Sequence, residues 1–280
     1  MKKFNVGLQL YSLRENLAVD FEGTLRAVKA MGYDYVEFAG HYGFGNKTGA
    51  EMKELLDEIG LTCISVHQGL DIFLKDGQAA FDFFKAFGVK YIVVPWFDLA
   101  KLPGTPAWEE SRKYFVEVSK AAAENGMKLL YHNHDFEFTK IGDRYVYDML
   151  FDDLKGYLDP QPDTCWLNYG GVNPSEYIRK YGDRINIVHL KDFVCTKLAA
   201  GPVYALIDEN GNAIDKSNKE DTGFCLVPLG QGRNDFASIL EACDDIDADL
   251  VIVEQDNFTG ITPLEGVKAS REYLKNTFGL

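Results

Sequence analysis

Four side chains of types that commonly bind metal ions follow successive apolar runs in the second half of the chain. They are Glu137, Asp163, His189 and Glu254. Three carboxylates and one imidazole suit Mn²⁺, Mg²⁺ or Co²⁺ better than they suit the sulfur-rich or histidine-rich sites of structural zinc. Carboxylates crowded together also repel one another unless a cation or a proton compensates them. The pattern predicts a divalent metal site, provided that the fold brings these four positions together.

The histidines follow the same rule, because each of them stands where an apolar run ends. They are His41, His67, His132, His134 and His189. We expect His132 and His134 to share one face of their strand, where either could act as a general acid or base near neutral pH. Alternation beyond His189 places Lys191 on the same face, where its ammonium could stabilise a developing negative charge.

Further polar and aromatic groups are expected around this set. Asp256 shares the parity of Glu254, and His67 is expected to line the same pocket. Trp96 and Phe136 could stack against the apolar face of a sugar ring, as aromatic side chains at wet pockets often do. Together with His132 and Lys191, these residues form the expected substrate-binding set.

Each of these residues also has a purely structural interpretation. A strand-end Asp or Glu is often a helix N-cap, and Asp163 before Thr164 could form a turn. Glu37 could belong to a structural ion pair inside the fold. His41 lies in a glycine-rich loop and is expected at the rim, since the spacing of that loop matches no phosphate-binding motif. The prediction therefore depends on the joint occurrence of the residues on consecutive strands.

A recurring junction organises the chain: a helical stretch, a glycine and then a β-rich run. It predicts strands over 33–38, 61–66, 89–94, 127–131 and 185–188, and three further strands are expected over 5–11, 156–159 and 250–253. Amphipathic helices are expected between them, for example over 21–31 and 107–125. Eight strands alternating with helices predict a single α/β domain over 1–280, a (β/α)8 TIM barrel whose carboxyl strand ends meet at one face.

One segment, about 195–228, interrupts the alternation after the seventh strand. Within it, 203–208 and 212–215 are expected to form a β-hairpin around Glu209, Asn210 and Gly211. A lid or specificity loop over the active face is one hypothesis. A decorative hairpin or a contact between subunits of a homo-oligomer is the alternative.

Composition narrows the classes of partner. The net charge of the 280 residues is −14, which repels phosphodiester backbones and anionic membranes and argues against nucleic acid or membrane binding. The five cysteines form no C-x-x-C pair, so a reducing compartment is expected. No signal peptide or membrane-spanning run is recognised, and a cytoplasmic location is predicted.

Five motifs carry a resemblance to a known family. They are GLQLYSLR at 7–14, YHNHDFEF at 131–138, VHLKD at 188–192, LGQG at 229–232 and VIVEQD at 251–256. In this order they resemble the xylose-isomerase-like superfamily, and more narrowly the bacterial proteins labelled sugar phosphate isomerase/epimerase. The resemblance covers nearly the whole chain.

The resemblance implies a TIM barrel that holds one divalent ion, Mn²⁺, Co²⁺, Mg²⁺ or Zn²⁺, with Glu, Asp, His and Glu from strands five to eight. Asp163, His189 and Glu254 match the last three positions. Ketose epimerases carry the first glutamate at the end of strand five, where this chain has Tyr131 and His132. The role is therefore assigned to Glu137, with His134 as its substitute.

The expected function is that of a divalent-metal-dependent isomerase or epimerase that abstracts a proton next to the carbonyl of a sugar or keto-sugar. Its expected catalytic groups are His134, Glu137, Glu254 and Lys191. A lyase is the alternative, because similar proteins with the His-Asn-His segment include dehydratases of keto-inositols and enzymes acting on 3-keto-glycosides. An endonuclease-IV-like phosphodiesterase would need more histidines and a basic groove. A non-catalytic sugar-binding barrel is the remaining alternative.

Overall fold

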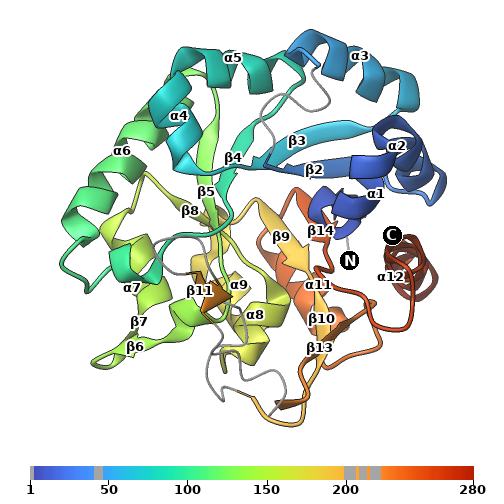
Figure 1. Cartoon of the computed structure of the whole chain (residues 1–280). Helices are drawn as coiled ribbons and strands as arrows, with labels where there is room; N and C mark the ends of the chain where they lie inside the picture. Colours follow the sequence, from blue (N-terminus) through green and yellow to red (C-terminus); the bar gives the residue numbers. More distant parts are fainter. Residues whose placement is uncertain (1–2, 41–46, 199–205, 208–212, 215–221) are drawn as a thin grey trace.

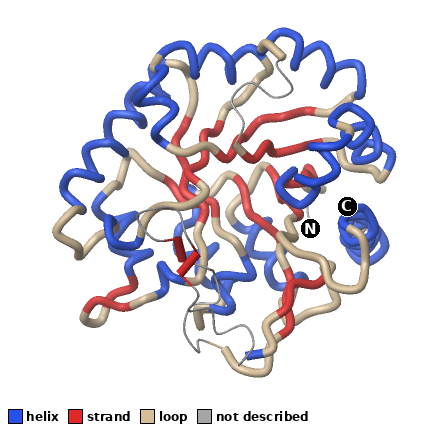
Figure 2. Tube along the Cα trace, in the orientation of Figure 1, coloured by secondary structure: helices blue, strands red, loops and turns tan. Residues whose placement is uncertain are grey.

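The computed structural model describes residues 3–40, 47–198, 206–207, 213–214 and 222–280. Among these residues, eight parallel strands form one sheet in the order β8-β5-β4-β3-β2-β1-β14-β9. The helices lie outside the strands (Figures 1 and 2). This is the predicted TIM barrel. The strands of the sheet are β1 Asn5–Gln9, β2 Tyr35–Ala39, β3 Thr62–His67, β4 Tyr91–Val94, β5 Lys128–His132, β8 Asp159–Gln161, β9 Ile187–Leu190 and β14 Leu250–Val253.

The barrel closes where β8 and β9, the two ends of the strand order, meet. An isolated parallel bridge joins Asp163 to His189, and the backbone N–H of His189 donates to the carbonyl of Pro162 over 2.9 Å. We call this junction the seam. The two residues of the bridge are both predicted metal ligands, so the site lies at the point where the barrel closes.

The sixth strand differs from the prediction. It was expected over 156–159, but β8 starts at Asp159 and includes Pro160. Gly156 adopts a φ of 86°, in the left-handed region that ends the preceding turn rather than extending a strand. Proline lacks a donor for a sheet, and it is tolerated here because β8 pairs along its length only with β5.

The helices surround the barrel, and several of them begin at a capping side chain or end at a glycine. Their bounds are α1 Arg14–Val19, α2 Phe21–Ala30, α3 Gly49–Ile59, α4 Leu70–Asp76, α5 Gln78–Ala86, α6 Trp108–Glu124, α7 Val146–Asp153, α8 Thr164–Tyr169, α9 Pro174–Tyr181, α11 Phe236–Asp245 and α12 Pro263–Phe278. In α3, for example, Thr48 and Glu51 form a capping box, and Gly60 ends the helix with a φ of 79°. The predicted helices over 21–31 and 107–125 correspond to α2 and α6.

Two apolar regions hold the strands in place. The larger lies between the sheet and the helices, and the smaller contains Val93, Leu130, Ile187, Leu250 and Ile252. Alternate residues of a strand face the same side. Two residues after Leu130, Ile187 and Ile252, the same faces therefore carry His132, His189 and Glu254. The strands thus change from apolar to polar at one level inside the barrel.

Short elements follow the carboxyl ends of several strands. They are the 3-10 helices η1 Leu10–Leu13, η3 Leu99–Lys101 and η4 Phe136–Phe138, and the strands β6 Lys140–Ile141, β7 Arg144–Tyr145, β10 Asp192–Val194, β11 Leu206–Ile207, β12 Ala213–Ile214 and β13 Cys225–Val227. The 3-10 helix η5 Gly182–Arg184 instead lies between α9 and the start of β9. β10 pairs antiparallel with β13, so a two-stranded ladder holds the two ends of the 195–228 segment together. Within that segment β11 pairs antiparallel with β12, whereas the expected turn at 209–211 lies outside the described residues.

Across the described ranges, no helix combines the length and the apolar character that a membrane span requires.

Candidate metal centre and active site

Four buried side chains at the seam place their ligand atoms within 4.8 Å of one another. They are His132, Asp163, His189 and Glu254. His132 Nε2 lies 3.7 Å from Asp163 Oδ2 and 3.8 Å from Glu254 Oε2. His189 Nδ1 lies 2.9 Å from the same oxygen of Glu254. We call these four residues the ligand group.

The geometry and chemistry of the ligand group fit a divalent cation. Ligand atoms about 2.1 Å from a tetrahedral ion lie about 3.4 Å apart, and the separations of 2.9, 3.7 and 3.8 Å bracket this value. Asp163 Oδ2 is buried and faces the other ligand atoms, with the Lys191 ammonium 3.1 Å away. Two carboxylates and two imidazoles form a mixed oxygen and nitrogen donor set. The residues present can therefore hold such an ion.

Glu137 does not belong to the ligand group, although the sequence assigned it the first ligand position. Its Oε1 accepts a hydrogen bond from the Tyr131 hydroxyl at 2.6 Å, and its Oε2 accepts one from the backbone N–H of His134 at 2.8 Å. The strand ends at His132, and the following turn of η4 carries Glu137 back toward Tyr131. The position closest to the other ligands is occupied by His132.

Asp163 caps a helix and also belongs to the ligand group. Its Oδ1 accepts hydrogen bonds from the backbone N–H groups of Cys165 and Trp166, and so caps α8. Its Oδ2 faces the ligand group. The amide side chain of Asn133 accepts the backbone N–H of Asp163 at 3.0 Å and fixes the chain at this point.

Lys191 brings a buried ammonium to the edge of the ligand group. Its Nζ lies 2.9 Å from Glu254 Oε2 and 3.1 Å from both Asp163 Oδ2 and Asp256 Oδ2, and the residue is 1% exposed. Burial would lower the pKa of Lys191, but Asp163, Asp256 and Glu254 raise it well above its ordinary value. The lysine is therefore a fixed positive charge against three carboxylates.

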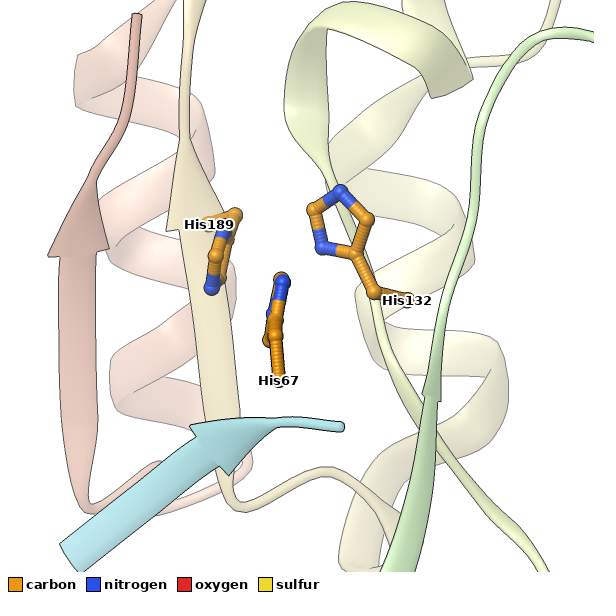
Figure 3. Close-up of side chains that lie close together, drawn as sticks. All are labelled: His67, His132 and His189. Atoms are coloured by element: carbon orange, nitrogen blue, oxygen red, sulfur yellow. The ribbon is translucent and has the colours of Figure 1, made fainter. Parts of the chain in front are cut away.

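A second cluster lies beside the ligand group. Figure 3 shows the imidazole rings of His67, His132 and His189 close together, and the ring of His67 is stacked on that of His189 with centroids 5.2 Å apart. His67 Nε2 lies 2.8 Å from Gln161 Oε1 and 2.9 Å from Glu37 Oε1. Both oxygens are acceptors, so this nitrogen carries a hydrogen and is not available to bind a metal ion.

Glu37 and Glu254 lie on opposite edges of the His189 ring. His189 Nε2 is 2.7 Å from Glu37 Oε1, and Nδ1 is 2.9 Å from Glu254. Burial would lower the pKa of His189, but the two carboxylates raise it to about 10. Burial would raise the pKa of Glu37, but His67 and His189 bring it below its ordinary value. Without an ion, His189 is thus an imidazolium between two carboxylates.

Other titratable groups of the site shift in ways that matter for proton transfer. Burial, with the nearby His189, lowers the pKa of His132 well below its ordinary value. Burial, with Lys191, does the same for His134. Both imidazoles are therefore neutral at pH 7 and able to accept a proton. Burial raises the pKa of Asp256 to about 6, although Lys191 opposes the shift.

Aromatic side chains line one side of these polar groups. The ring of Phe136 is stacked on that of His134 at 5.6 Å, and Lys191 Nζ lies 5.3 Å from the centroid of Trp166. Trp166 is in turn stacked on Phe224, which lies just before β13. Trp96 follows β4, is half-buried and packs against the larger core.

The structure thus brings together Asp163, His189, Glu254, Lys191 and Asp256, as the sequence pattern predicted. It adds His132 to the ligands and leaves Glu137 outside, and His41 lies outside the described residues. Sequence reasoning assigned Glu37 only a structural role and gave none to Gln9, Gln161 and Trp166. Gln9, Glu37 and Gln161 are fully buried polar residues on barrel strands, two of them at the strand end. The strand-end signal that singled out the histidines could have found Gln9 and Gln161, but not Glu37, which lies in the middle of β2.

Comparisons with known proteins agree with this architecture. The family model described as xylose isomerase-like TIM barrel matches residues 25–277. A protein of Clostridium perfringens named inosose dehydratase is 28% identical over 218 residues, which cover 71% of this chain and 69% of that protein.

Two solved structures share the fold. A sugar phosphate isomerase/epimerase from Parabacteroides distasonis has a TM-score of 0.76 at 20% identity and covers 99% of this chain and 96% of its own. The IolI protein with a bound zinc atom has a TM-score of 0.68 at 16% identity and covers 98% and 97%. At these identities the two structures show the fold alone.

Proposed function

Because the chain belongs to the xylose isomerase-like TIM barrel family, we propose that it is a metal-dependent enzyme that abstracts a proton next to the carbonyl of a sugar or keto-sugar. The observation that carries the proposal is the buried ligand group with Lys191 against its edge. Relatives named inosose dehydratase, and the zinc bound in IolI, support an enzyme with a divalent ion.

The ion would be held by His132, Asp163, His189 and Glu254. When bound, it would polarise the substrate carbonyl and lower the pKa of the neighbouring C–H. The protein supplies the rest of the chemistry. Lys191 is a fixed cation that stabilises the negative charge developing on the carbonyl oxygen, a contribution that in other enzymes reaches about 10²-fold to 10³-fold in rate.

His134 is the base that we propose. Its imidazole is neutral at pH 7 because burial lowers its pKa, and it lies outside the ligand group with its ring 5.4 Å from that of His132. A neutral imidazole accepts the proton without first losing one. Phe136 and Trp166, which contact the His134 ring, restrict its rotation and shield it from water.

Elimination of water is the outcome that we favour. In ketose epimerases, which this chain resembles, a pair of glutamates at the metal moves the proton. Here only Glu254 belongs to the ligand group, because Glu137 accepts hydrogen bonds from Tyr131 and His134 instead. A dehydratase needs one base for the α-proton and one donor for the departing hydroxide. Asp256 is our candidate donor, because a pKa raised to about 6 leaves a fraction of this carboxyl group protonated near neutral pH, and Lys191 Nζ lies 3.1 Å away.

Epimerisation is the second candidate. The two neutral imidazoles of His132 and His134 lie beside the carboxylate of Glu254, and such a set could return the proton to the other face of the carbon. In that case the carbon skeleton and all hydroxyl groups are retained.

One experiment separates the outcomes. The protein is incubated with keto-inositols, 3-keto-glycosides and ketoses in D₂O with added Mn²⁺ or Co²⁺, and products are followed by NMR and mass. We expect loss of water from a keto-substrate, and loss of that activity in His189→Ala and Glu254→Gln. Deuterium in an epimer without loss of water would favour epimerisation. The absence of both water loss and deuterium incorporation with every member of the panel would contradict the proposal.

A further inference from the structure

Glu37 is a fully buried carboxylate that stands at the ligand group without belonging to it. Its Oε1 lies 2.7 Å from His189 Nε2, and the residue is 0% exposed. A buried carboxylate is costly unless it is paired and hydrogen-bonded. The question is whether it serves only the stability of the barrel or also the ligand that it touches.

The two nitrogens of His189 have different surroundings. Nδ1 faces Glu254 inside the ligand group, whereas Nε2 faces Glu37 outside it. A carboxylate such as Glu37 only accepts hydrogen bonds, so Nε2 must carry a hydrogen. A cation that binds at Nδ1 then displaces only the hydrogen on that nitrogen.

We infer that Glu37 is a positioning residue for the metal ligand His189. Its carboxylate keeps the hydrogen on Nε2, fixes the plane of the ring and leaves the lone pair of Nδ1 directed at the ion. Carboxylates in this place orient metal-bound imidazoles and increase their basicity in other metalloproteins. The inference rests on the proposed metal site.

Glu37 is itself held from other strands of the barrel. Gln9 Nε2 on β1 donates to Oε1 at 2.8 Å, and Gln161 Nε2 on β8 donates to Oε2 at 2.7 Å. His67 on β3 approaches Oε1 to 2.9 Å. The carboxylate cannot turn away from His189 without losing these contacts. Residues of three further strands therefore fix the position of the His189 ring through Glu37.

The test is the affinity of the purified protein for Co²⁺ and Mn²⁺, measured by titration against a competing chelator, without any substrate. We expect Glu37→Gln to weaken binding about 10-fold to 100-fold and to shift the visible absorption of bound Co²⁺. Asp159→Asn is the matched control, because it also replaces a carboxylate on a barrel strand, one paired with Lys128 and Arg184 away from the ligand group. Its metal affinity should stay within about twofold of the wild type.

Glu37→Asp keeps the charge and withdraws it by one methylene, so it tests the inference if Glu37→Gln does not fold. We expect the metal affinity of Glu37→Asp to lie between that of the wild type and that of Glu37→Gln. Wild-type affinity and an unchanged Co²⁺ spectrum in the folded variants would overturn the role of Glu37 and leave the proposed function standing. A wild-type protein that binds neither metal would overturn both.

Discussion

At the scale of single residues, Glu137 shows how a position next to the site differs from a position in it. The residue is fully buried, and its two oxygens accept hydrogen bonds from Tyr131 and His134. Burial raises its pKa to about 8, although these donors oppose the shift. At neutral pH a proton therefore resides on a group that loses its proton near pH 4.3 in an unfolded chain.

The sign of the resulting pH dependence follows from proton binding. Between about pH 4.5 and pH 8 the folded protein holds a proton that the unfolded chain has released, so the free energy of unfolding falls as the pH rises. Glu137→Gln removes this titration. We expect the variant to lose less stability than the wild type between pH 5 and pH 8, by on the order of a few kcal/mol.

Urea unfolding at both pH values measures this difference. EDTA is present throughout, so that the occupancy of the ligand group does not change with pH. If the free energies of unfolding of the two proteins changed in parallel with pH, Glu137 would not carry a raised pKa.

The residues of the site could be predicted from the sequence where a strand placed them. Asp163, His189 and Glu254 were chosen as metal-ligand types at or just beyond the ends of apolar runs, and the structure brings them together. Parity stops with the strand, and β5 ends at His132. The positions of His134 and Glu137 depend instead on the turn of η4 and on the Tyr131 hydroxyl. A residue pattern does not encode that contact.

At the scale of elements, the carboxylate of Asp192 ties the end of the seventh strand to a loop nearly forty residues later. Its two oxygens accept hydrogen bonds from the backbone N–H groups of Gly230, Gly232 and Asn234 at 2.8–3.1 Å. The amide side chain of Asn234 donates to the carbonyl of Lys191 at 2.7 Å. The loop therefore holds the backbone of the buried cation in place.

Gly232→Ala tests this connection. A Cβ at Gly232 would overlap Asp192 Oδ1 and the carbonyl oxygen of Phe193, so the loop must move away from the carboxylate. We expect a loss of about 1–3 kcal/mol in the free energy of unfolding. A lower kcat should accompany it, because Lys191 shifts with the loop.

Gln231 is exposed and adjacent to Gly232, so Gln231→Ala is the control. The stability and kcat of this variant should stay close to those of the wild type. Wild-type kcat in Gly232→Ala would show that the loop stabilises the fold without positioning Lys191.

The elements of the fold were predictable to different degrees. The helices expected over 21–31 and 107–125 from their amphipathic periodicity were placed to within a residue or two, as α2 and α6. The sixth strand was placed about three residues early, because Pro160 argues against a strand until its neighbours are known. The pairing of β10 with β13 joins residues more than thirty positions apart, and no local pattern indicates it.

At the scale of the whole molecule, the ligand group spans the seam. Asp163 follows β8 and His189 lies on β9, and these strands are the two ends of the sheet order. In the described residues the sheet connects them only through a single bridge and the hydrogen bond from His189 to Pro162. An ion bound by both side chains would connect the ends of the barrel a second time.

This connection predicts where a bound ion stabilises the fold. Ligand at 100 times its Kd adds about 2.7 kcal/mol to the free energy of unfolding. In hydrogen exchange with and without Mn²⁺, we expect the gain in protection to be largest for the amides of Asp159, Gln161 and Asp163 and for those of 187–190. Amides of β3, which lies in the middle of the strand order and away from the seam, should gain less protection. Local openings of β3 do not separate Asp163 from His189.

Asp163→Asn is the control that keeps the fold. An asparagine oxygen can still accept the N–H groups of Cys165 and Trp166 and cap α8, so the helix is retained. The variant loses the charge that faces the ion and pairs with Lys191, and Mn²⁺ should then add little protection at the seam. Equal gains at β3 and at the seam in the wild type would contradict a closing role, since the ion would then stabilise the barrel only as a whole.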